Sequence, residues 1–228
     1  MSFVLDASAN SGAALVNDSS GDYQFNHTVA SGANLLVVTL GTRHNPVPRT
    51  ASVTYDGAAM TSVGAESNQE ASTGTYNVTQ IYYLVSPASG TNVVDITFNG
   101  PNVDFLVAGA NSFFGGAAAP LDTSGSHDTT TQVSTATTGA LTADKANSLF
   151  IDVIMANNGN TGTATDPTRT AQIYEAASGS NCSASSYILS VAAGADTYNY
   201  PVGGTDYMSY YGAIFTTAPV GNRGYIIG

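Results

Sequence analysis

The stretch TQIYYLVSPASGTNVVDITFNG, residues 79–100, decides the fold. Aromatic and β-branched residues lie on both sides of a Ser-Pro-Ala-Ser-Gly turn, and Asp95 is the one charged residue among them. Residues of these types favour strands, whereas Pro and Gly favour the turns between strands. In the second segment Val94, Ile96 and Phe98 alternate with polar residues, so one face should be buried and the other exposed to water. We therefore predict two strands joined by a tight turn.

The same pattern continues along the chain. Apolar residues alternate or form short runs, and Gly, Pro, Asn or Ser-Gly interrupts them roughly every ten residues, so helical periodicity is almost absent. The apolar run LLVVTL, residues 35–40, is typical of a strand in the core of a sandwich, and Asp56-Gly57 predicts a hairpin turn. The predicted strands cover residues 24–30, 35–42, 51–56, 76–85, 92–98, 105–114, 133–138, 148–156, 170–176, 184–192 and 207–216.

The second half of the chain resembles the first. Two similar antiparallel halves are typical of a double Greek key, and hence of a jelly-roll-like sandwich. Three pairs of segments match in order: residues 35–45 with 149–159, 81–96 with 186–200, and 105–115 with 207–217.

We therefore predict an all-β fold, an antiparallel β-sandwich of the jelly-roll-like, double Greek key type. A single domain should span residues 1–228, with its two echoing halves at about 24–115 and 148–217. Residues 116–147 should form a long crossover between them. Two small separate domains would also fit the repeat, but no linker rich in Pro or charge divides the chain.

Charged side chains make up only 9% of the residues, against roughly 25% in an ordinary soluble domain. The surface should therefore consist mainly of Ser, Thr, Asn and Gly. The 16 acidic residues outnumber the 5 lysines and arginines, which gives a net charge of −11. Such a chain repels phosphate backbones, so we expect no nucleic-acid partner. Cys182 is the only cysteine, so no disulfide can form within the chain, and we expect it to be a small buried or half-buried strand residue.

Five segments, in this order along most of the chain, resemble a known family: ANLLVVTL (33–40), SVTYDGAAMTSVG (52–64), IYYLVSPASGT (81–91), VAGANSF (107–113) and APLDT (119–123). The family consists of jelly-roll-like β-sandwich domains of bacterial surface proteins and of phage structural proteins, including capsid decoration and tail proteins. Its secreted members typically carry a signal or further domains. The N-terminal residues here contain no basic segment followed by an apolar run, so we expect no signal peptide, and no stretch approaches the ~20 apolar residues of a membrane span. The resemblance therefore implies the phage branch, with synthesis in the host cytoplasm and assembly on the virion surface.

Catalytic and metal-binding motifs are absent from the sequence. His27, His44 and His127 are isolated, and we expect them on solvent-facing loops. Glu66 and Glu70 lie in the polar stretch AESNQEASTG, which we interpret as a mobile loop and not as half of a glycosidase carboxylate pair. We therefore predict no enzyme activity, no cofactor, no metal site and no membrane partner.

Two segments are candidate interfaces. RHNPVPR holds Arg43, His44 and Arg49, and on an acidic molecule this electropositive loop could dock an acidic neighbour. A rigid surface loop without a partner is the alternative. The apolar C-terminus could be an arm exchanged with a neighbouring subunit, through Tyr225, Ile226 and Ile227.

These features favour a non-enzymatic phage virion structural protein, a capsid decoration or cement subunit that stabilises the head surface. Its partners would be the major capsid protein or other virion subunits, and we expect a homo-oligomer, with a trimer as the closed form. The alternative is a carbohydrate-binding adhesion module of a tail fibre or cell-surface protein. Tyr210 or Tyr211 would then stack on the glycan, because tyrosine combines an apolar ring with a hydrogen-bonding hydroxyl.

Overall fold

A computed structural model describes residues 2–10, 15–18, 21–101, 103–128, 132–157, 171–178 and 181–219. Every regular element in this part of the chain is a strand, and the strands pair antiparallel, so the prediction of an all-β antiparallel sandwich is confirmed. The first half holds β1 (Val4–Asn10), β2 (Leu15–Asp18), β3 (Asp22–Val29), β4 (Leu35–His44), β5 (Ala51–Tyr55), β6 (Ala58–Ala59), β7 (Thr61–Gln69), β8 (Tyr76–Val85), β9 (Gly90–Phe98) and β10 (Val103–Phe114). The second half holds β11 (Gly116–Asp128), β12 (Val133–Thr137), β13 (Leu141–Ala143), β14 (Ser148–Asn157), β15 (Ala171–Ser178), β16 (Asn181–Val191), β17 (Gly194–Asp196) and β18 (Asn199–Thr217).

Each half has an inner and an outer layer. The first inner sheet has the order β1-β10-β4-β8-β7, with β2 also paired to β10, and the first outer sheet has the order β3-β9-β5-β6. The second inner sheet has the order β11-β18-β14-β16-β15. The second outer layer consists of β12, which pairs with the beginning of β18, and of β13 paired with β17.

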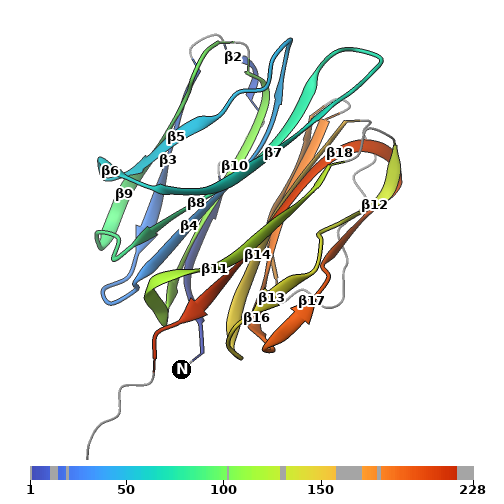
Figure 1. The fold of residues 1–228 in the computed structure, drawn as a ribbon. Helices are drawn as coiled ribbons and strands as arrows, with labels where there is room; N and C mark the ends of the chain where they lie inside the picture. Colours follow the sequence, from blue (N-terminus) through green and yellow to red (C-terminus); the bar gives the residue numbers. More distant parts are fainter. Residues whose placement is uncertain are drawn as a thin grey trace, which may run out of the picture.

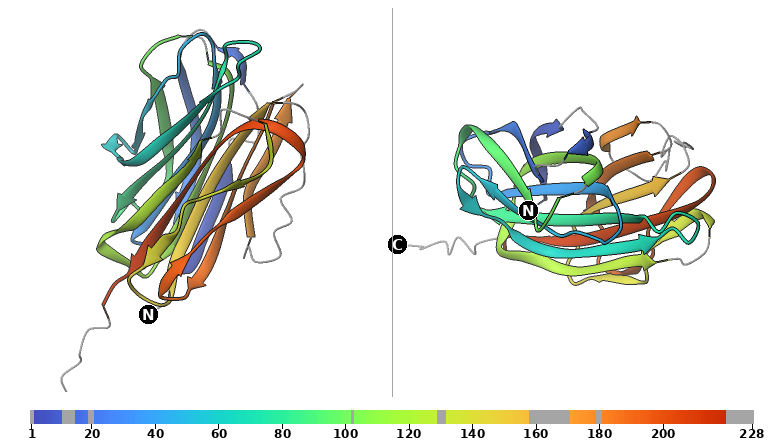
Figure 2. Two further views of the ribbon diagram at one scale, coloured as in Figure 1. Left: turned by 45° about the vertical axis from the view of Figure 1, so that its right-hand side comes forward. Right: turned by 90° about the horizontal axis from the view of Figure 1, so that it is seen from above.

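The two inner sheets pack face to face, so the described strands form a stack of layers with the two halves side by side (Figures 1 and 2). One cluster of buried apolar side chains fills the space between the inner sheets and draws residues from both halves. Another cluster lies between the first inner and outer sheets, and two smaller clusters lie beneath the second outer layer. The two halves therefore share a core, and we call the contact between the inner sheets the seam.

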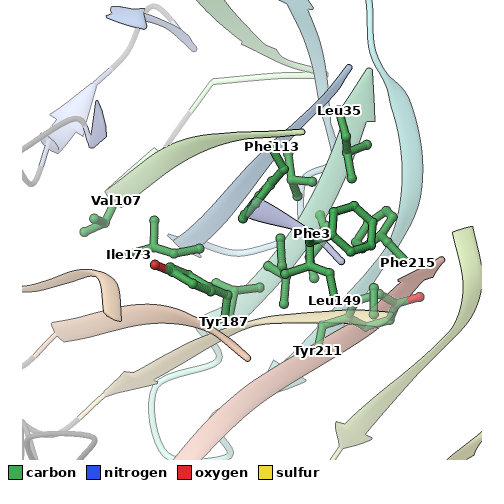
Figure 3. Packing of buried hydrophobic residues seen from close by; sticks show 14 of the residues in the cluster. Phe3, Leu35, Val107, Phe113, Leu149, Ile173, Tyr187, Tyr211 and Phe215 are labelled. Carbon is green, nitrogen blue, oxygen red and sulfur yellow. The ribbon is translucent and has the colours of Figure 1, made fainter. Parts of the chain in front are cut away.

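Aromatic rings from the two halves meet in the seam (Figure 3). The rings of Phe113 and Tyr187 contact edge to face with centroids 5.8 Å apart, and Tyr83 meets Phe215 in the same way at 5.8 Å. Each such pair contributes about 0.5–1.5 kcal/mol beyond the burial of its area. The seam is therefore packed like a protein interior and not like a loose contact between domains.

Burial on both sides explains why the inner strands are continuously apolar. All of residues 35–40 on β4 and 149–155 on β14 are buried. Side chains alternate along each strand, so Leu35 and Val37 face the seam while Leu36 and Val38 face the outer sheet. A strand with only one buried face would instead alternate with polar residues, as β3 and β9 do in the outer sheet.

The arrangement of the inner sheets repeats between the halves. The strands β4, β8 and β10 occupy the same relative positions in the first inner sheet as β14, β16 and β18 do in the second. These are the strands that contain the matching sequence segments of the two halves. The sequence repeat thus corresponds to a repeat of strand order.

The stretch at residues 79–100 forms its two strands but does not form a hairpin. β8 belongs to the first inner sheet and β9 to the first outer sheet, so the turn between them crosses from one layer to the next. The predicted alternation on β9 is confirmed, because Val94, Ile96 and Phe98 are buried and Thr97 is exposed. The pairing partners of both strands lie far away in the sequence.

Other local predictions are confirmed. Asp56 and Gly57 join β5 to β6 with φ values of 51° and 74°, the left-handed conformation that a tight hairpin turn requires. Cys182 is buried on β16. Several segments without a strand prediction do form strands. The longest are residues 61–69, which are β7 at the edge of the first inner sheet, and residues 116–128, which are β11 at the edge of the second. The interpretation of AESNQEASTG as a loop is therefore wrong for its first half.

Close approach of the inner sheets depends on Gly41 of β4. A Cβ atom at this position would lie 1.8 Å from the Oγ atom and 2.6 Å from the Cβ atom of Ser183 on β16, and 3.3 Å from the carbonyl oxygen of Ile154. No side chain fits there unless the two halves move apart. Only glycine allows the backbones of the two sheets to come this close.

We predict that Gly41→Ala lowers the free energy of unfolding by about 1–3 kcal/mol, the usual cost of overpacking a core. Gly139→Ala is the matched control, because a Cβ atom there meets nothing within 4 Å. Adding Ser183→Gly to Gly41→Ala should restore most of the loss, since it removes both of the side-chain clashes. Urea unfolding measures all three variants. Equal stability of Gly41→Ala and Gly139→Ala would contradict the close approach.

Candidate functional site

The structure separates the residues of the predicted basic loop. Arg43 lies near the end of β4 with its side chain 17% exposed, and it points across the seam. Its Nη1 donates to Oδ1 of Asn181 in the second half at 3.0 Å, and its Nη2 donates to Oγ1 of Thr75 at 3.0 Å. The same Nη2 lies 3.6 Å from Oε2 of Glu70, which is the one ion pair in the described part of the chain. Arg43 is therefore an internal tie between the halves.

Glu70 is held by hydroxyl groups of the turn between β7 and β8. Ser72 Oγ donates to its Oε1 at 2.7 Å, and Thr73 Oγ1 donates to its Oε2 at 2.7 Å. Burial alone would raise the pKa of Glu70, but these hydrogen bonds, a further one from Thr75 and the charge of Arg43 outweigh it, so the pKa is lowered. Glu70 is thus held as a carboxylate.

Further polar contacts join the halves beside this ion pair. Asn157 of β14 donates through Nδ2 to Oε2 of Glu70. Farther along the seam, Asn77 Nδ2 donates to the carbonyl oxygen of Tyr207 at 2.8 Å, and the hydroxyls of Thr79 and Ser209 are 2.8 Å apart. We call the group at the end of the seam the seam cluster: Arg43, Glu70, Thr75, Asn157 and Asn181.

Charges in the seam cluster also affect the pKa values of two further carboxyl groups, those of Asp206 and Asp104. Burial raises the pKa of Asp206 to about 7; the backbone amide of Tyr207 and the charge of Arg43 oppose this rise, and the charge of Glu70 adds to it. The contact with the Tyr207 amide lacks full hydrogen-bond geometry, and no other described residue donates to the carboxyl oxygens of Asp206. Burial also raises the pKa of Asp104, again opposed by Arg43. Burying a carboxylate with so little compensation costs stability, so Asp206 takes up its proton near neutral pH, well above the usual range of a carboxyl group.

His44 and Arg49 do not join Arg43 in a basic surface patch. His44 is fully buried, and its Nε2 lies 2.8 Å from Oγ1 of Thr42. Arg49 is half-buried with its guanidinium against Gly100, where a Cβ atom would lie 2.6 Å from Nη1. Residues 45–48 are exposed and uncharged, and Val47 among them is 43% exposed. An electropositive docking loop made of Arg43, His44 and Arg49 therefore does not fit the structure.

His27 is buried as well, between the first inner and outer sheets. Ser112 Oγ donates its proton to Oδ2 of Asp6 at 2.8 Å, and His27 Nε2 lies 3.1 Å from the same Oγ. Because the hydroxyl proton is already used, Nε2 must carry the ring proton and donate it to Ser112. The chain Asp6, Ser112, His27 contains the residue types of a hydrolase triad, but serine stands in the middle and donates to the acid. It cannot act as a nucleophile activated by the histidine.

Both histidines are neutral in the folded protein. Thr42 Oγ1 donates to the carbonyl oxygen of Val78, so His44 Nε2 donates to Thr42 as His27 Nε2 donates to Ser112. In each ring the remaining Nδ1 is buried and lacks a hydrogen-bond partner among the described residues. Burial lowers the pKa of both rings from 6.5 to about 4, with Asp6 opposing the shift at His27 and Arg49 adding to it at His44. The expectation that isolated histidines face solvent is wrong for these two.

Of the tyrosines predicted to stack on a glycan, Tyr210 lies inside the second half and Tyr211 lies in the seam. Tyr210 is fully buried, and its hydroxyl donates to Oδ2 of Asp152 at 2.8 Å. The other carboxylate oxygen of Asp152 accepts hydrogen bonds from the amide and the hydroxyl of Ser186. Tyr211 is 8% exposed, with its hydroxyl 2.9 Å from Ser124 Oγ. Neither ring offers a free face, so a glycan platform on this pair does not fit their burial.

Some of the predicted residues lie outside the described part of the chain, and neither a metal-ligand group nor a membrane-spanning helix is found in the described part. The predicted arm residues Tyr225, Ile226 and Ile227 lie outside the described residues, as does the side chain of His127. Among the described residues, no group of three or more His, Cys, Asp or Glu side chains is placed to hold a metal ion. The described part of the chain also contains no helix long and apolar enough to cross a membrane.

No protein-family model, curated protein or solved structure matches this chain. Sequence reasoning missed the seam cluster, although strand alternation contains a signal for it. Arg43 has the same parity on β4 as Leu35 and Val37, which face the seam, and His44 has the parity of Leu36, which faces the outer sheet.

We predict that acid destabilises the protein through its two buried histidines. Above pH 6.5 both rings are neutral whether folded or not, so they contribute no pH dependence. Between pH 6.5 and about 4 the histidines bind protons in the unfolded chain but stay neutral in the folded protein. As the pH falls through this range, the free energy of unfolding falls by about 3 kcal/mol for each ring. Asp206 acts in the opposite direction, because its folded pKa of about 7 lies above the ordinary 3.8, so stability rises as pH falls through this range.

The measurement is the slope of unfolding free energy against pH between 7 and 4.5, in the parent and in the His27→Gln/His44→Gln double variant. Both proteins retain Asp206, so the difference between their slopes isolates the histidines. The variant is expected to lose less stability per pH unit than the parent, whatever its stability at pH 7. Identical slopes would show that the rings titrate normally and are not buried as described.

Proposed function

We propose that this chain is a non-enzymatic structural protein of a phage virion, a decoration or cement subunit on the capsid surface. The observation that carries the proposal is the seam. Two β-sandwiches are fused through a shared apolar core with aromatic contacts and through an internal ion pair, which gives a rigid block and not two mobile modules. Rigid blocks with sparsely charged surfaces suit the reinforcement of a regular shell.

We further propose that the first half is a jelly roll. With β2 and β7 taken as additions, its inner sheet contains the first, eighth, third and sixth strands in that spatial order, and its outer sheet contains the second, seventh, fourth and fifth. This distribution is that of a jelly roll, a fold used by viral capsid proteins and by lectins. The repeated order of the second inner sheet extends the proposal to the second half. Fold alone supports the virion role only by analogy.

The edges of the sheets support assembly with neighbours. Strands β7 and β15 end the two inner sheets, and β3 ends the first outer sheet. An edge strand is a ready template for pairing, so a virion subunit could cover its edges with sister subunits, in a homotrimer, or with the major capsid protein. For docking on the shell we propose the exposed loop at residues 45–48, with Val47 as its apolar tip.

The alternative function, a carbohydrate-binding adhesion module, was predicted on Tyr210 and Tyr211. Both rings are buried, so these residues no longer support it. The virion role is therefore the function that the described residues support best.

The test begins with virions of the phage whose genome encodes the chain. We expect peptides of the chain in purified particles, in a fixed ratio to the major capsid protein by quantitative mass spectrometry. Particles made without the gene should bind the purified protein at saturable positions and should release their DNA at a lower temperature without it. Absence from the particles, together with no binding to particles that lack it, would overturn the proposal.

A matched pair of variants tests the docking loop. Val47→Asp places a charge on the exposed tip, while Val93→Asp does the same on β9, where the side chain is 40% exposed on the outer sheet. We expect shell binding to weaken about tenfold or more for Val47→Asp and to be unchanged for Val93→Asp, since only the first buries a charge at the proposed contact. Equal binding of the two variants would exclude the loop as the docking site.

A further inference from the structure

A pocket of about 450 Å³ opens at the end of the second half, where β16 turns into β17 and the chain enters β18. Its volume falls within the roughly 300–1,000 Å³ of small-molecule sites. β17 lies at the lower end of this half in Figure 1, on the side away from the seam. The lining residues are Ile188, Ser190, Val191, Ala192, Asp196, Thr197, Tyr198 and Asn199.

The pocket occurs where the second half departs from the first. In the first half the strand after the corresponding turn, β9, runs unbroken and pairs with β3 along its length. In the second half the corresponding segment is interrupted at Thr197 and Tyr198, between β17 and β18. Two hydrogen bonds hold the interruption: Thr138 N donates to Tyr198 O at 2.9 Å, and Tyr198 N donates to Thr138 Oγ1 at 3.0 Å. The fold does not need this break, because the first half is built without it.

The interruption turns an aromatic ring inward. Tyr198 is 6% exposed, and its ring stacks on Phe150 of β14 with centroids 3.7 Å apart and an interplanar angle of 11°. Val191 is buried beside it and Ile188 is half-buried in the same cluster. The pocket therefore has a rigid apolar floor beneath a polar rim.

The rim combines one carboxylate with neutral hydrogen-bonding groups. Asp196, Asn199, Ser190 and Thr197 are exposed around the opening. Asp196 Oδ1 accepts the backbone amide of Thr197 at 2.8 Å, which fixes the orientation of the carboxylate. Hydroxyl and amide groups can both donate and accept, and a carboxylate accepts hydrogen bonds through both of its oxygens. Such a rim above an apolar floor matches a ligand with several neighbouring hydroxyls on one side and C–H groups on the other.

The negative charge of the pocket and of the whole chain favours neutral ligands over anionic ones. Among the described residues that line the pocket there is no lysine, arginine or histidine, and the chain carries a net charge of −11. An acidic sugar or a phosphate would face Asp196 without a compensating cation. We propose that this pocket binds a neutral sugar residue, with Asp196, Asn199 and Ser190 hydrogen-bonded to its hydroxyls and the apolar floor against its C–H face. The proposal goes beyond the virion role and does not rest on it.

Two variants and a control from the repeated half test the site. Asp196→Asn keeps an oxygen for the Thr197 amide but removes the charge. Ser190→Gly removes a rim hydroxyl at a residue with φ of 63°, where glycine is unstrained, so the variant should fold at least as well as the parent. Ser86→Gly is the matched control, because Ser86 has φ of 54° in the corresponding turn of the first half and does not line the pocket.

The probes are the methyl glycosides of glucose, galactose, mannose and N-acetylglucosamine, titrated into the full-length protein and followed by amide NMR shifts. Glucuronic acid serves as the acidic comparison. We expect at least one neutral sugar to shift amides clustered at residues 188–199. Its affinity should fall about tenfold or more in Asp196→Asn, because a hydrogen bond to a charged group is lost, and severalfold in Ser190→Gly, with no change in Ser86→Gly.

Three results would overturn the proposal: no shift with any neutral sugar, shifts that cluster away from residues 188–199, or affinities unchanged in both pocket variants. Tighter binding of glucuronic acid than of every neutral sugar would overturn the assigned ligand class. The sugar-binding proposal and the virion proposal can each fail without the other. A chain absent from virions could still bind the sugar, and a chain that decorates the shell could leave this pocket empty.

Discussion

The rest of the structure depends on the packing of one inner sheet against the other. Each inner sheet is buried on both faces, and this requires strands that are apolar throughout, such as residues 35–40, and a backbone position without a side chain at Gly41. Burial of apolar area supplies the stabilisation, at about 25 cal/mol per Å². It also sets the shape, because two sandwiches that share a core cannot move independently. The proposed function as a rigid surface subunit follows from this constraint.

The seam ends in polar residues, some of which stabilise one another while one destabilises the folded state. Arg43 and Glu70 are half-buried as a pair, and neutral amides and hydroxyls make most of their other hydrogen bonds, while Arg43 Nε has no partner among the described residues. Breaking such a pair is expensive, but replacing both partners by apolar residues is often neutral, so the pair is better explained by register than by stability. Asp206 is compensated only weakly, by the Tyr207 amide and the charge of Arg43, and its charged form destabilises the folded state above its pKa of about 7. A carboxyl group that is kept at a cost is consistent with a protein whose seam responds to pH.

The sequence predicted what depends on neighbouring residues. Short apolar runs and alternating patterns located β4, β8, β9, β10, β14 and β18, and Asp56-Gly57 located a hairpin, because these signals act over a few residues. These local signals do not predict the layer to which a strand belongs. Residues 79–100 form two strands in different sheets, and only their distant partners decide this. Tyr210 and His44 looked like surface residues by type, yet the second layer of packing on each inner sheet buries them. The pocket at Asp196 could not be predicted from the sequence, because it lies where the two halves differ in structure, and the sequence match between them is too loose to locate that difference.

The two halves should form one cooperative unit, because they share the packing of the seam. Native-state hydrogen exchange in increasing urea, resolved by mass spectrometry, measures it most directly, because it reports the opening free energy of each strand separately. We expect the slowest amides of β4 and β10 to exchange with the same free energy, and the same dependence on urea, as those of β14 and β18. Opening of one half at a distinctly lower free energy, while the strands of the other stay protected, would contradict it.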